Sequence, residues 1–164
     1  SGSLAASEYL ALLHGLEAGR PAAVDLRRER ALHEAVRQAR DGGLLASAHD
    51  CSEGGLAVAL AECCISGPDG ALGASLEIAP GEAGRRLDAL LFGEAPTRII
   101  VSTSPENRAR LEAHLRSTDV PFHVLGKVGG SRLTIAVGGN AVVDLDETTL
   151  RSAWRQALPA LVGK

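Results

Sequence analysis

The residues best suited to chemistry lie in one stretch, residues 47–62, which reads SAHDCSEGGLAVALAE. His49, Asp50 and Ser52 are residue types found in hydrolytic triads. However, side chains this close together in a turn point away from one another rather than toward one reacting atom. Capping explains them better, because the oxygens of Asp50 and Ser52 can accept hydrogen bonds from the free N–H groups of a helix. We therefore expect a strand end, a polar turn and then a helix.

Two glycines, Gly54 and Gly55, occupy the first turn of that predicted helix. Each destabilises a helix by roughly 1 kcal/mol relative to alanine, which predicts that something comes close to the backbone there. A phosphate held by the two amides is one candidate, and another segment of the protein is the other. No Gly-Lys-Ser/Thr follows, so the pattern is not a P-loop. Residues 56–65 are apolar on nearly every face, which predicts a buried helix and favours the neighbouring segment over the phosphate.

The three cysteines are best interpreted as packed thiols. Cys51 lies near a helix N-terminus, where the pKa of a thiol can fall, but the sequence gives it no obvious partner. Cys63 and Cys64 are adjacent on the predicted helix and point to different faces, which disfavours a zinc site built with Cys51 and His49. An odd cysteine count without a secretory signal favours a reducing, cytoplasmic location. We predict no metal ligands in this chain.

Composition narrows the classes of partner. At 164 residues, the chain is one domain or a domain with an appendage. Aromatic residues make up only 2%, which argues against base stacking with single-stranded nucleic acid. The net charge of −3 gives no electrostatic footprint for a polyanion, and no apolar run is long enough to span a bilayer. We therefore expect neither a nucleic acid nor a membrane partner.

Hydrophobic periodicity and turn residues predict helices interspersed with strands. The helices are expected at residues 7–16, 26–40, 56–65, 84–91, 105–117 and 147–158. Ser7 and Asp25 are the expected caps of the first two helices, and Asp146 or Thr148 is the expected cap of the last. The strands are expected at residues 44–48, 72–78, 97–102, 122–128, 132–137 and 141–145, with a turn at 67–70. Strand–helix–strand crossovers favour parallel neighbours, whereas the closing strands favour antiparallel pairing. The predicted fold class is α+β with α/β-like crossovers, in which helices pack on a mixed β-sheet.

Several of these patterns together resemble one known superfamily. Residues 49–62 are similar to the signature of the C-terminal domain of the aminoimidazole ribonucleotide synthetase (PurM-like) superfamily. Its Gly-Glu loop with the next strand, and its closing strands, are matched by residues 91–94 with 98–102 and by 121–128 with 133–135. The linker entering the second such domain of the phosphoribosylformylglycinamidine synthases is matched by residues 7–10, 14–15, 19–21 and 25–26.

The resemblance implies a domain layout and a parent enzyme. Residues 1–24 would be a linker helix from a preceding domain, and residues 25–164 a PurM-like C-terminal domain. The chain starts Ser-Gly-Ser and has no methionine, so we expect a piece of a longer protein. That protein would be the ATP- and glutamine-dependent ligase of purine biosynthesis that converts formylglycinamide ribonucleotide to its amidine through a phosphorylated amide oxygen.

The resemblance also implies where the chemistry lies. In the family, the ATP-binding strands, magnesium ligands and catalytic histidine belong mostly to the N-terminal-type domains, which this chain lacks. Those domains of the same chain, and a glutaminase component, are the expected partners. We therefore expect no catalytic residue and no bound ATP or magnesium in this chain, which alone should be inactive.

Six residues are candidates for contact with a phosphate, nucleotide or substrate: Asp50, Ser52, Gly54, Gly55, Glu94 and Arg98. The family's substrate loop reads Gly-Glu-Ser-Gln, and residues 93–96 read Gly-Glu-Ala-Pro. Alanine and proline cannot replace the hydroxyl and carboxamide as hydrogen-bond partners, which fits a non-catalytic copy. A structural role, such as an ion pair between Glu94 and Arg98, is therefore favoured over contact with a ligand.

Two other interpretations remain open. The chain could be the equivalent domain of an aminoimidazole ribonucleotide synthetase, a selenophosphate synthetase, a thiamine-phosphate kinase or a hydrogenase maturation factor. It could also be a stand-alone binding module.

Overall fold

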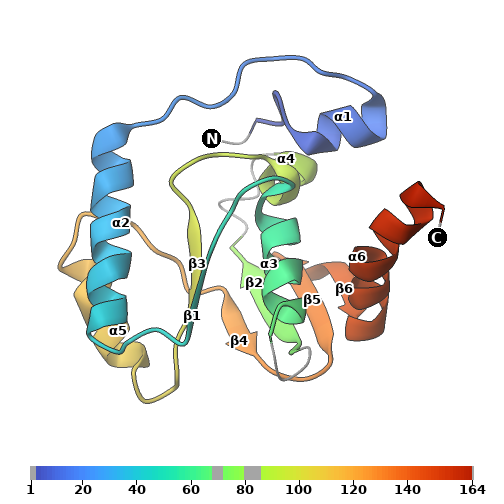
Figure 1. Ribbon diagram of the computed structural model, residues 1–164. Helices are drawn as coiled ribbons and strands as arrows, with labels where there is room; N and C mark the ends of the chain where they lie inside the picture. Colours follow the sequence, from blue (N-terminus) through green and yellow to red (C-terminus); the bar gives the residue numbers. More distant parts are fainter. Residues whose placement is uncertain (1–2, 68–71, 80–85, 164) are drawn as a thin grey trace. The chain divides into compact units, whose positions relative to one another are not determined.

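The structure is a computed structural model that describes residues 3–67, 72–79 and 86–163. Within these ranges, helices and strands follow one another in the predicted order (Figure 1). The chain divides into two compact units. Unit 1 comprises Ser1–Ala59 and Leu87–Val124, and unit 2 comprises Leu60–Arg86 and Leu125–Lys164. Each unit is described below by itself.

Unit 1 contains α1 (Glu8–His14), α2 (Leu26–Asp41), β1 (Ser47–Asp50), the start of α3 (Gly55–Ile65), α4 (Leu87–Phe92), β3 (Ile99–Ser102) and α5 (Arg108–Arg116). The predicted caps begin the first two helices. Ser7 accepts a hydrogen bond from the Leu10 N–H, and Asp25 accepts from the N–H groups of Arg27 and Arg28. These bonds satisfy N–H groups that have no partner inside the helix.

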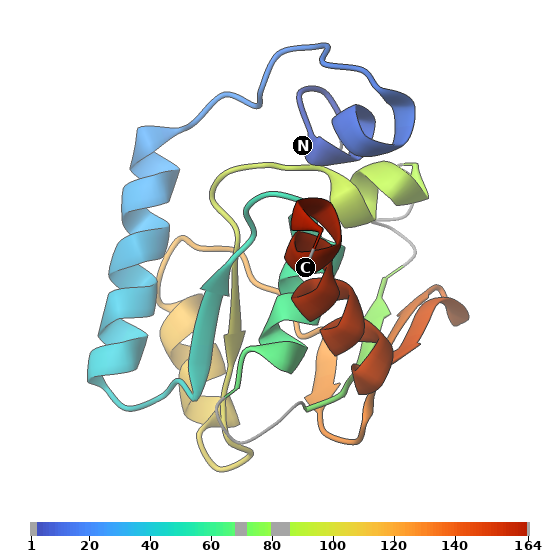
Figure 2. The ribbon, with the colours of Figure 1, turned by 45° about the vertical axis from the view of Figure 1, so that its right-hand side comes forward.

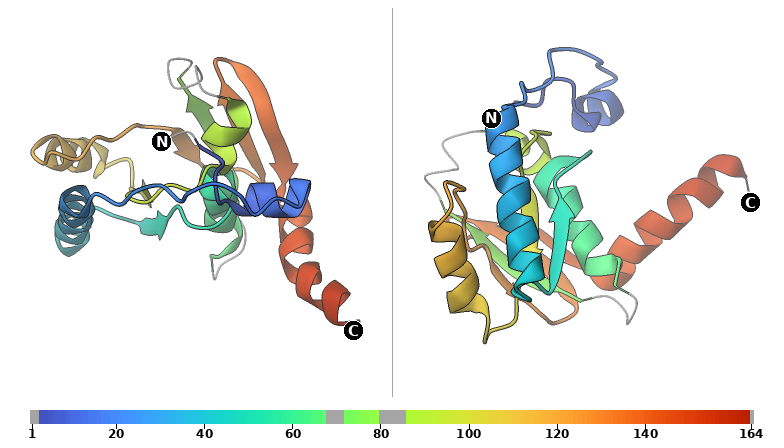
Figure 3. Two further views of the ribbon diagram at one scale, coloured as in Figure 1. Left: turned by 90° about the horizontal axis from the view of Figure 1, so that it is seen from above. Right: turned by 60° about the vertical axis from the view of Figure 1, so that its left-hand side comes forward.

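The core of unit 1 lies between two helices and a small sheet. β1 and β3 form an antiparallel pair, and α2 and α5 lie side by side (Figure 1, Figure 3). The buried side chains are alanines from α2 and leucines from α5 and the segment after α2: Ala35, Ala39, Leu44, Leu111 and Leu115. The alanines on α2 recur at helical spacing, so that their shared face can approach a neighbouring element closely.

Unit 2 is built on a four-stranded sheet in the order β4 (Gly126–Val128), β2 (Ala74–Ile78), β5 (Arg132–Val137) and β6 (Asn140–Asp146). β2 alternates buried and exposed side chains, as a strand with one covered face does. Leu133 and Ile135 of β5 are fully buried beside it. α6 (Glu147–Val162) follows β6 directly (Figure 2), and Asp146, one of its two predicted caps, accepts a hydrogen bond from the Thr149 N–H.

The strand pairing differs from the prediction in two ways. The strands form a mixed four-stranded sheet and a separate two-stranded sheet rather than one mixed sheet. The crossovers through α3, α4 and α5 join strands of different sheets, so none creates the expected parallel neighbours. The parallel pair is β2 with β5, which are separated by other elements, while the β5–β6 hairpin is antiparallel as predicted. Local periodicity defines a strand but not its partner.

Several element bounds also shift. The strand predicted at residues 44–48 lies at 47–50, because the Leu44 N–H donates to the Ala39 oxygen and so continues the end of α2. Its exposed side chains contradict the expected burial. The helix predicted from Pro105 begins at Arg108, after a turn in which the Arg108 N–H donates to the Pro105 oxygen.

The remaining predicted elements are present but differ in length. The strand predicted at 122–128 is limited to Gly126–Val128, whereas the last helix runs to Val162 rather than to residue 158. The helix predicted at 84–91 is present as α4 over Leu87–Phe92. Residues 84–85, and most of the turn predicted at 67–70, lie outside the described residues. Within the described ranges, no helix combines the length and the apolar character that crossing a membrane requires.

Candidate functional site

The structure brings the six candidate residues together at one place in unit 1. β1 ends at Asp50, which pairs with Ile99 of β3. The ladder continues one residue further, because the Cys51 N–H donates to the Arg98 oxygen at 3.0 Å. The turn of residues 50–55 therefore lies next to the loop of residues 93–98. We call this region the α3 mouth.

Glu94 is the central side chain of the α3 mouth. Its Oε1 accepts a hydrogen bond from the Gly54 N–H at 2.8 Å and another from the Glu8 N–H at 2.9 Å. Gly54 immediately precedes α3, and Glu8 is the first residue of α1. One half-buried carboxylate thus serves two helix N-termini, where free N–H groups and the helix dipole favour a negative charge.

The expected side-chain caps of α3 are not formed. The Gly55 N–H donates to the main-chain oxygen of Ser52 at 3.1 Å. Within the described part of the chain, the side chains of Asp50 and Ser52 accept no hydrogen bond from the first turn, and Glu94 supplies the acceptor instead. The reason is local geometry, because Gly54 and Gly55 have φ angles of 76° and 69° and turn the backbone away from a normal cap.

Gly55 allows a neighbouring protein segment to approach, as the sequence favoured, whereas Gly54 faces a side chain of α3. A Cβ on Gly55 would lie 2.8 Å from the main-chain carbon of Phe92 and 2.9 Å from the oxygen of Gly93. A Cβ on Gly54 would meet the side chain of Val58 at 2.5 Å. Both positions also have left-handed backbone conformations, which glycine adopts without strain. The packing of the 92–94 segment therefore requires a glycine at position 55.

Arg98 holds the loop from its other side. Its Nη2 donates to the oxygen of Gly93 at 2.5 Å, and its Nε to the oxygen of Ala95 at 3.5 Å. The guanidinium thus binds main-chain oxygens of the loop rather than the Glu94 carboxylate. The expected ion pair is replaced by two separate contacts that fix the same loop.

Sequence reasoning missed two residues that anchor this loop. Thr97 has a φ of 64°, which is rare for a β-branched residue, and its hydroxyl donates to Glu29 Oε2 at 2.5 Å. The other oxygen of Glu29 lies 3.1 Å from Nε2 of His33. Glu29 looks like an ordinary solvent-facing position of α2 in the sequence, so no local signal marks it as a partner of Thr97.

The α3 mouth is poorly suited to a phosphate. The Gly54 N–H that would hold the anion already donates to Glu94, so that a phosphate would meet a carboxylate. Asp50 and Glu53 add negative charge nearby in the chain. Among the described residues, no group of three or more His, Cys, Asp or Glu side chains could hold a metal ion. The geometry supports packing, while contact of the six residues with a ligand in a longer protein stays a prediction.

A family comparison agrees with the arrangement of these elements. Residues 1–138 match the family model described as AIR synthase related protein, C-terminal domain. The chain belongs to this family. The AIR synthase related domain includes the whole α3 mouth, whereas all of α6 lies beyond the matched residues.

Two relatives of this AIR synthase related domain carry the same name. The chain is 46% identical over 168 residues to a protein of Anaeromyxobacter sp. (strain Fw109-5), and 41% identical over 158 residues to one of Moorella thermoacetica. Both are named phosphoribosylformylglycinamidine synthase subunit PurL. The alignments cover 98% and 96% of this chain but 21% of each relative. The chain therefore spans about a fifth of the length of these relatives.

Solved structures support the same fold. PurL from Thermotoga maritima complexed with FGAR matches 79% of this chain and 22% of its own, with a TM-score of 0.63 at 22% identity. A structure titled PurLQS from Thermotoga maritima matches 86% of this chain with a TM-score of 0.59. Both likenesses concern the fold of the AIR synthase related domain.

Cys51 of this domain should be an unreactive thiol. It is 8% exposed, and burial raises the pKa of its thiol, an effect that Arg98 partly opposes. At pH 7.5 we expect iodoacetamide to alkylate Cys51 in the folded chain at least about tenfold more slowly than in urea, because the thiolate is the nucleophile. Peptide-resolved mass spectrometry measures both rates, with the half-buried Cys63 as an internal comparison. Equal rates in the two states would mean that the fold does not protect Cys51, and a faster rate in the folded chain would identify it as an activated nucleophile.

Proposed function

We propose that this chain is a C-terminal-type domain of a phosphoribosylformylglycinamidine synthase. The observation that carries the proposal is the 46% identity to a PurL protein over 98% of this chain. The alignment spans nearly all residues of both units rather than one motif. The parent protein would be an ATP-dependent ligase that converts formylglycinamide ribonucleotide to formylglycinamidine ribonucleotide.

Within that ligase, the domain serves as scaffold rather than as catalyst. Glu94 accepts hydrogen bonds from the N-termini of two helices, and Arg98 donates to a main-chain oxygen of the loop. These contacts leave the α3 mouth without an obvious reacting group. ATP and magnesium would bind through the N-terminal-type domains of the longer chain and supply the phosphorylation of the amide oxygen. Structures of PurL from T. maritima are titled as complexes with ATP and with ADP, which supports nucleotide binding by the parent.

The proposal also concerns the neighbouring domain, the partner and the location of the parent protein. Residues 1–24 would connect to a preceding domain, although Glu8 and Tyr9 already contact residues 94 and 92 of this domain. A glutaminase component would deliver ammonia, in line with the relative whose structure is titled PurLQS. The parent would act in the cytoplasm, where purine nucleotides are made.

A domain exchange tests this function. The corresponding fifth of the Anaeromyxobacter PurL is replaced by this chain, and ADP release is measured with formylglycinamide ribonucleotide, ATP, magnesium and ammonia. We expect the chimera to fold and retain most of the ligase activity, whereas the isolated chain shows no turnover with the same reagents. An insoluble or inactive chimera would favour another member of the superfamily, and turnover by the isolated chain would refute the scaffold role.

A further inference from the structure

Helix α6 of unit 2 carries a row of apolar side chains along one face. Leu150, Trp154, Leu158 and Leu161 recur at intervals of three and four residues, which places them above one another on the helix surface. Trp154, Leu158 and Leu161 are 63%, 67% and 85% exposed, whereas Leu150, in the first turn after β6, is half-buried. We call these four residues the α6 stripe.

The rest of unit 2 gives α6 little support. The helix leaves the end of β6 and projects away from the four-stranded sheet (Figure 3), and every residue from 153 to 162 is exposed. Pro159 lies inside the helix and has no N–H to donate to the preceding turn. An isolated helix shorter than about 12–15 residues is marginal in water, because most helical stability in proteins comes from packing of one face. The α6 stripe therefore indicates a helix that is stabilised by a partner.

The extent of the sequence matches indicates where that partner belongs. The family model ends at residue 138, before α6 begins. The alignment with the Anaeromyxobacter relative covers 98% of this chain, so it includes most of α6. The helix is thus shared with that PurL protein but lies outside the domain that the wider family shares. Because this chain spans only 21% of the relative, a longer protein of this type has other domains on which α6 can pack.

The size of the α6 stripe favours a domain of the same protein over a separate chain. At 1.5 Å per residue, the 16 residues of α6 span about 24 Å, and a face about 10 Å wide presents roughly 240 Å². Stable association of separate chains typically requires about 800 Å² on each partner. A tethered domain requires less, because its linker keeps it at an effective concentration that reaches roughly the millimolar range.

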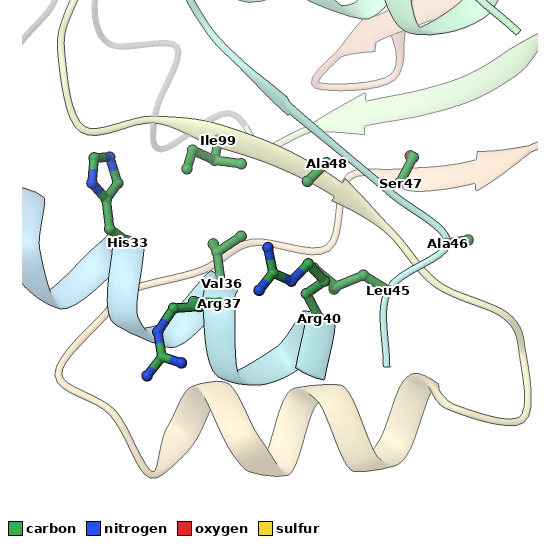
Figure 4. A pocket seen from close by; sticks show the side chains of 9 residues that line it. All are labelled: His33, Val36, Arg37, Arg40, Leu45, Ala46, Ser47, Ala48 and Ile99. Atoms are coloured by element: carbon green, nitrogen blue, oxygen red, sulfur yellow. The ribbon is translucent and has the colours of Figure 1, made fainter. Parts of the chain in front are cut away.

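A groove on this chain does not suit the charges of α6. After Glu147, the charged side chains of α6 are Arg151 and Arg155, which lie on the Leu158 side of the stripe. A groove of about 360 Å³ lies between α2 and β1 in unit 1 (Figure 4), and none of the described residues that line it is acidic. The carboxylates of Glu34 and Asp41 nearby already bind the arginines of α2. A second copy would therefore offer α6 no acidic rim in this groove.

We propose that the α6 stripe docks into an apolar groove with acidic groups at its rim, on another domain of the longer protein. The inference rests on the function proposed above, which supplies that domain. An amphipathic helix suits this mode, because its apolar face enters a groove through side chains spaced three and four residues apart. Trp154 and Leu158 contact the floor of the groove, and Arg151 and Arg155 meet carboxylates at its rim.

Hydrogen exchange of the α6 amides tests the proposal in the isolated chain and in the chimera with the Anaeromyxobacter PurL. We expect these amides to exchange at least about tenfold more slowly in the chimera, while those of β5 exchange equally in both. Leu158→Glu should remove most of this difference. Gln156→Glu, which introduces the same side chain on the opposite face of α6, should leave it unchanged. An active chimera with unprotected α6 amides would refute docking and leave the proposed function intact.

A second measurement applies if the chimera is insoluble. A fluorescein-labelled peptide of residues 146–163 is titrated by anisotropy into the Anaeromyxobacter PurL from which the segment matching α6 has been deleted. We expect binding that weakens as salt is added, because the arginines meet carboxylates. No binding at concentrations up to about 100 µM would refute docking, and binding independent of salt would refute the acidic rim. A dimer of the isolated chain, seen by sedimentation and abolished by Leu158→Glu, would assign the α6 stripe to a second copy and also refute the proposal.

Discussion

Gly55→Ala is expected to destabilise unit 1 by about 3 kcal/mol or more. A left-handed conformation costs a residue with a side chain roughly 1–2 kcal/mol. The new Cβ would also overlap the main chain of Phe92 and Gly93, which cannot move without displacing Glu94. Overpacking of this kind typically adds about 1–3 kcal/mol. Gly55→Val adds two further carbons at the same place and should lower the melting temperature more.

Gly43→Ala is the matched control for this prediction. Gly43 also belongs to unit 1 and has a φ of 64°, but a Cβ there would meet nothing within 4 Å. Its substitution should therefore lower the free energy of unfolding only by the cost of a left-handed conformation, about 1–2 kcal/mol. Urea denaturation of both variants measures the difference. Equal losses of unfolding free energy in the two variants would mean that the 92–94 segment does not pack closely against Gly55 in solution.

Glu94→Ala is expected to lower the free energy of unfolding by about 1–3 kcal/mol. The substitution leaves the half-buried N–H of Gly54 without its acceptor, which typically costs about 1–3 kcal/mol, whereas water can replace the carboxylate at the exposed N–H of Glu8. It also removes the negative charge next to the N-termini of α1 and α3. Calorimetry should show a fall in melting temperature of several degrees for each kcal/mol lost.

Glu94→Gln separates the hydrogen bonds from the charge. Glutamine keeps a carbonyl oxygen that can accept both bonds, so this variant should lose less than half as much stability as Glu94→Ala. A second comparison uses phosphate at constant ionic strength. If Glu94 occupies the anion position, phosphate should stabilise the Glu94→Ala chain and leave the original chain unchanged. Stabilisation of the original chain instead would establish a phosphate site at the α3 mouth.

The sequence predicted local structure well where a single side chain decides it. The oxygens of Ser7, Asp25 and Asp146 begin three helices at the expected places. The apolar run of residues 56–65 forms α3, and Gly55 of the glycine pair does receive a neighbouring segment. In each case the residues that cause the local structure lie close together in the sequence, so their spacing is enough to predict it.

The features that the sequence did not predict depend on contacts between residues that lie far apart in the chain. The acceptor for α3 was sought among neighbouring residues, but it comes from Glu94, 40 positions later in the chain. For the same reason, the sequence did not predict the pairing of β1 with β3. It also did not predict the contact of Thr97 with Glu29, which are 68 positions apart. Hydrophobic periodicity indicates which face of a helix or strand is buried, but it does not indicate which other element packs on that face.

The discontinuous make-up of unit 1 has a consequence for synthesis on the ribosome. Residues 1–59 emerge before residues 87–124, with β1 lacking its partner strand and the Gly54 N–H lacking its acceptor. Both partners belong to the second stretch, 87–124, so unit 1 can close only after residues 60–86 of unit 2 have been translated. A nascent chain paused before residue 94 exposes the edge of β1 and the apolar start of α3, which are the features that chaperones bind.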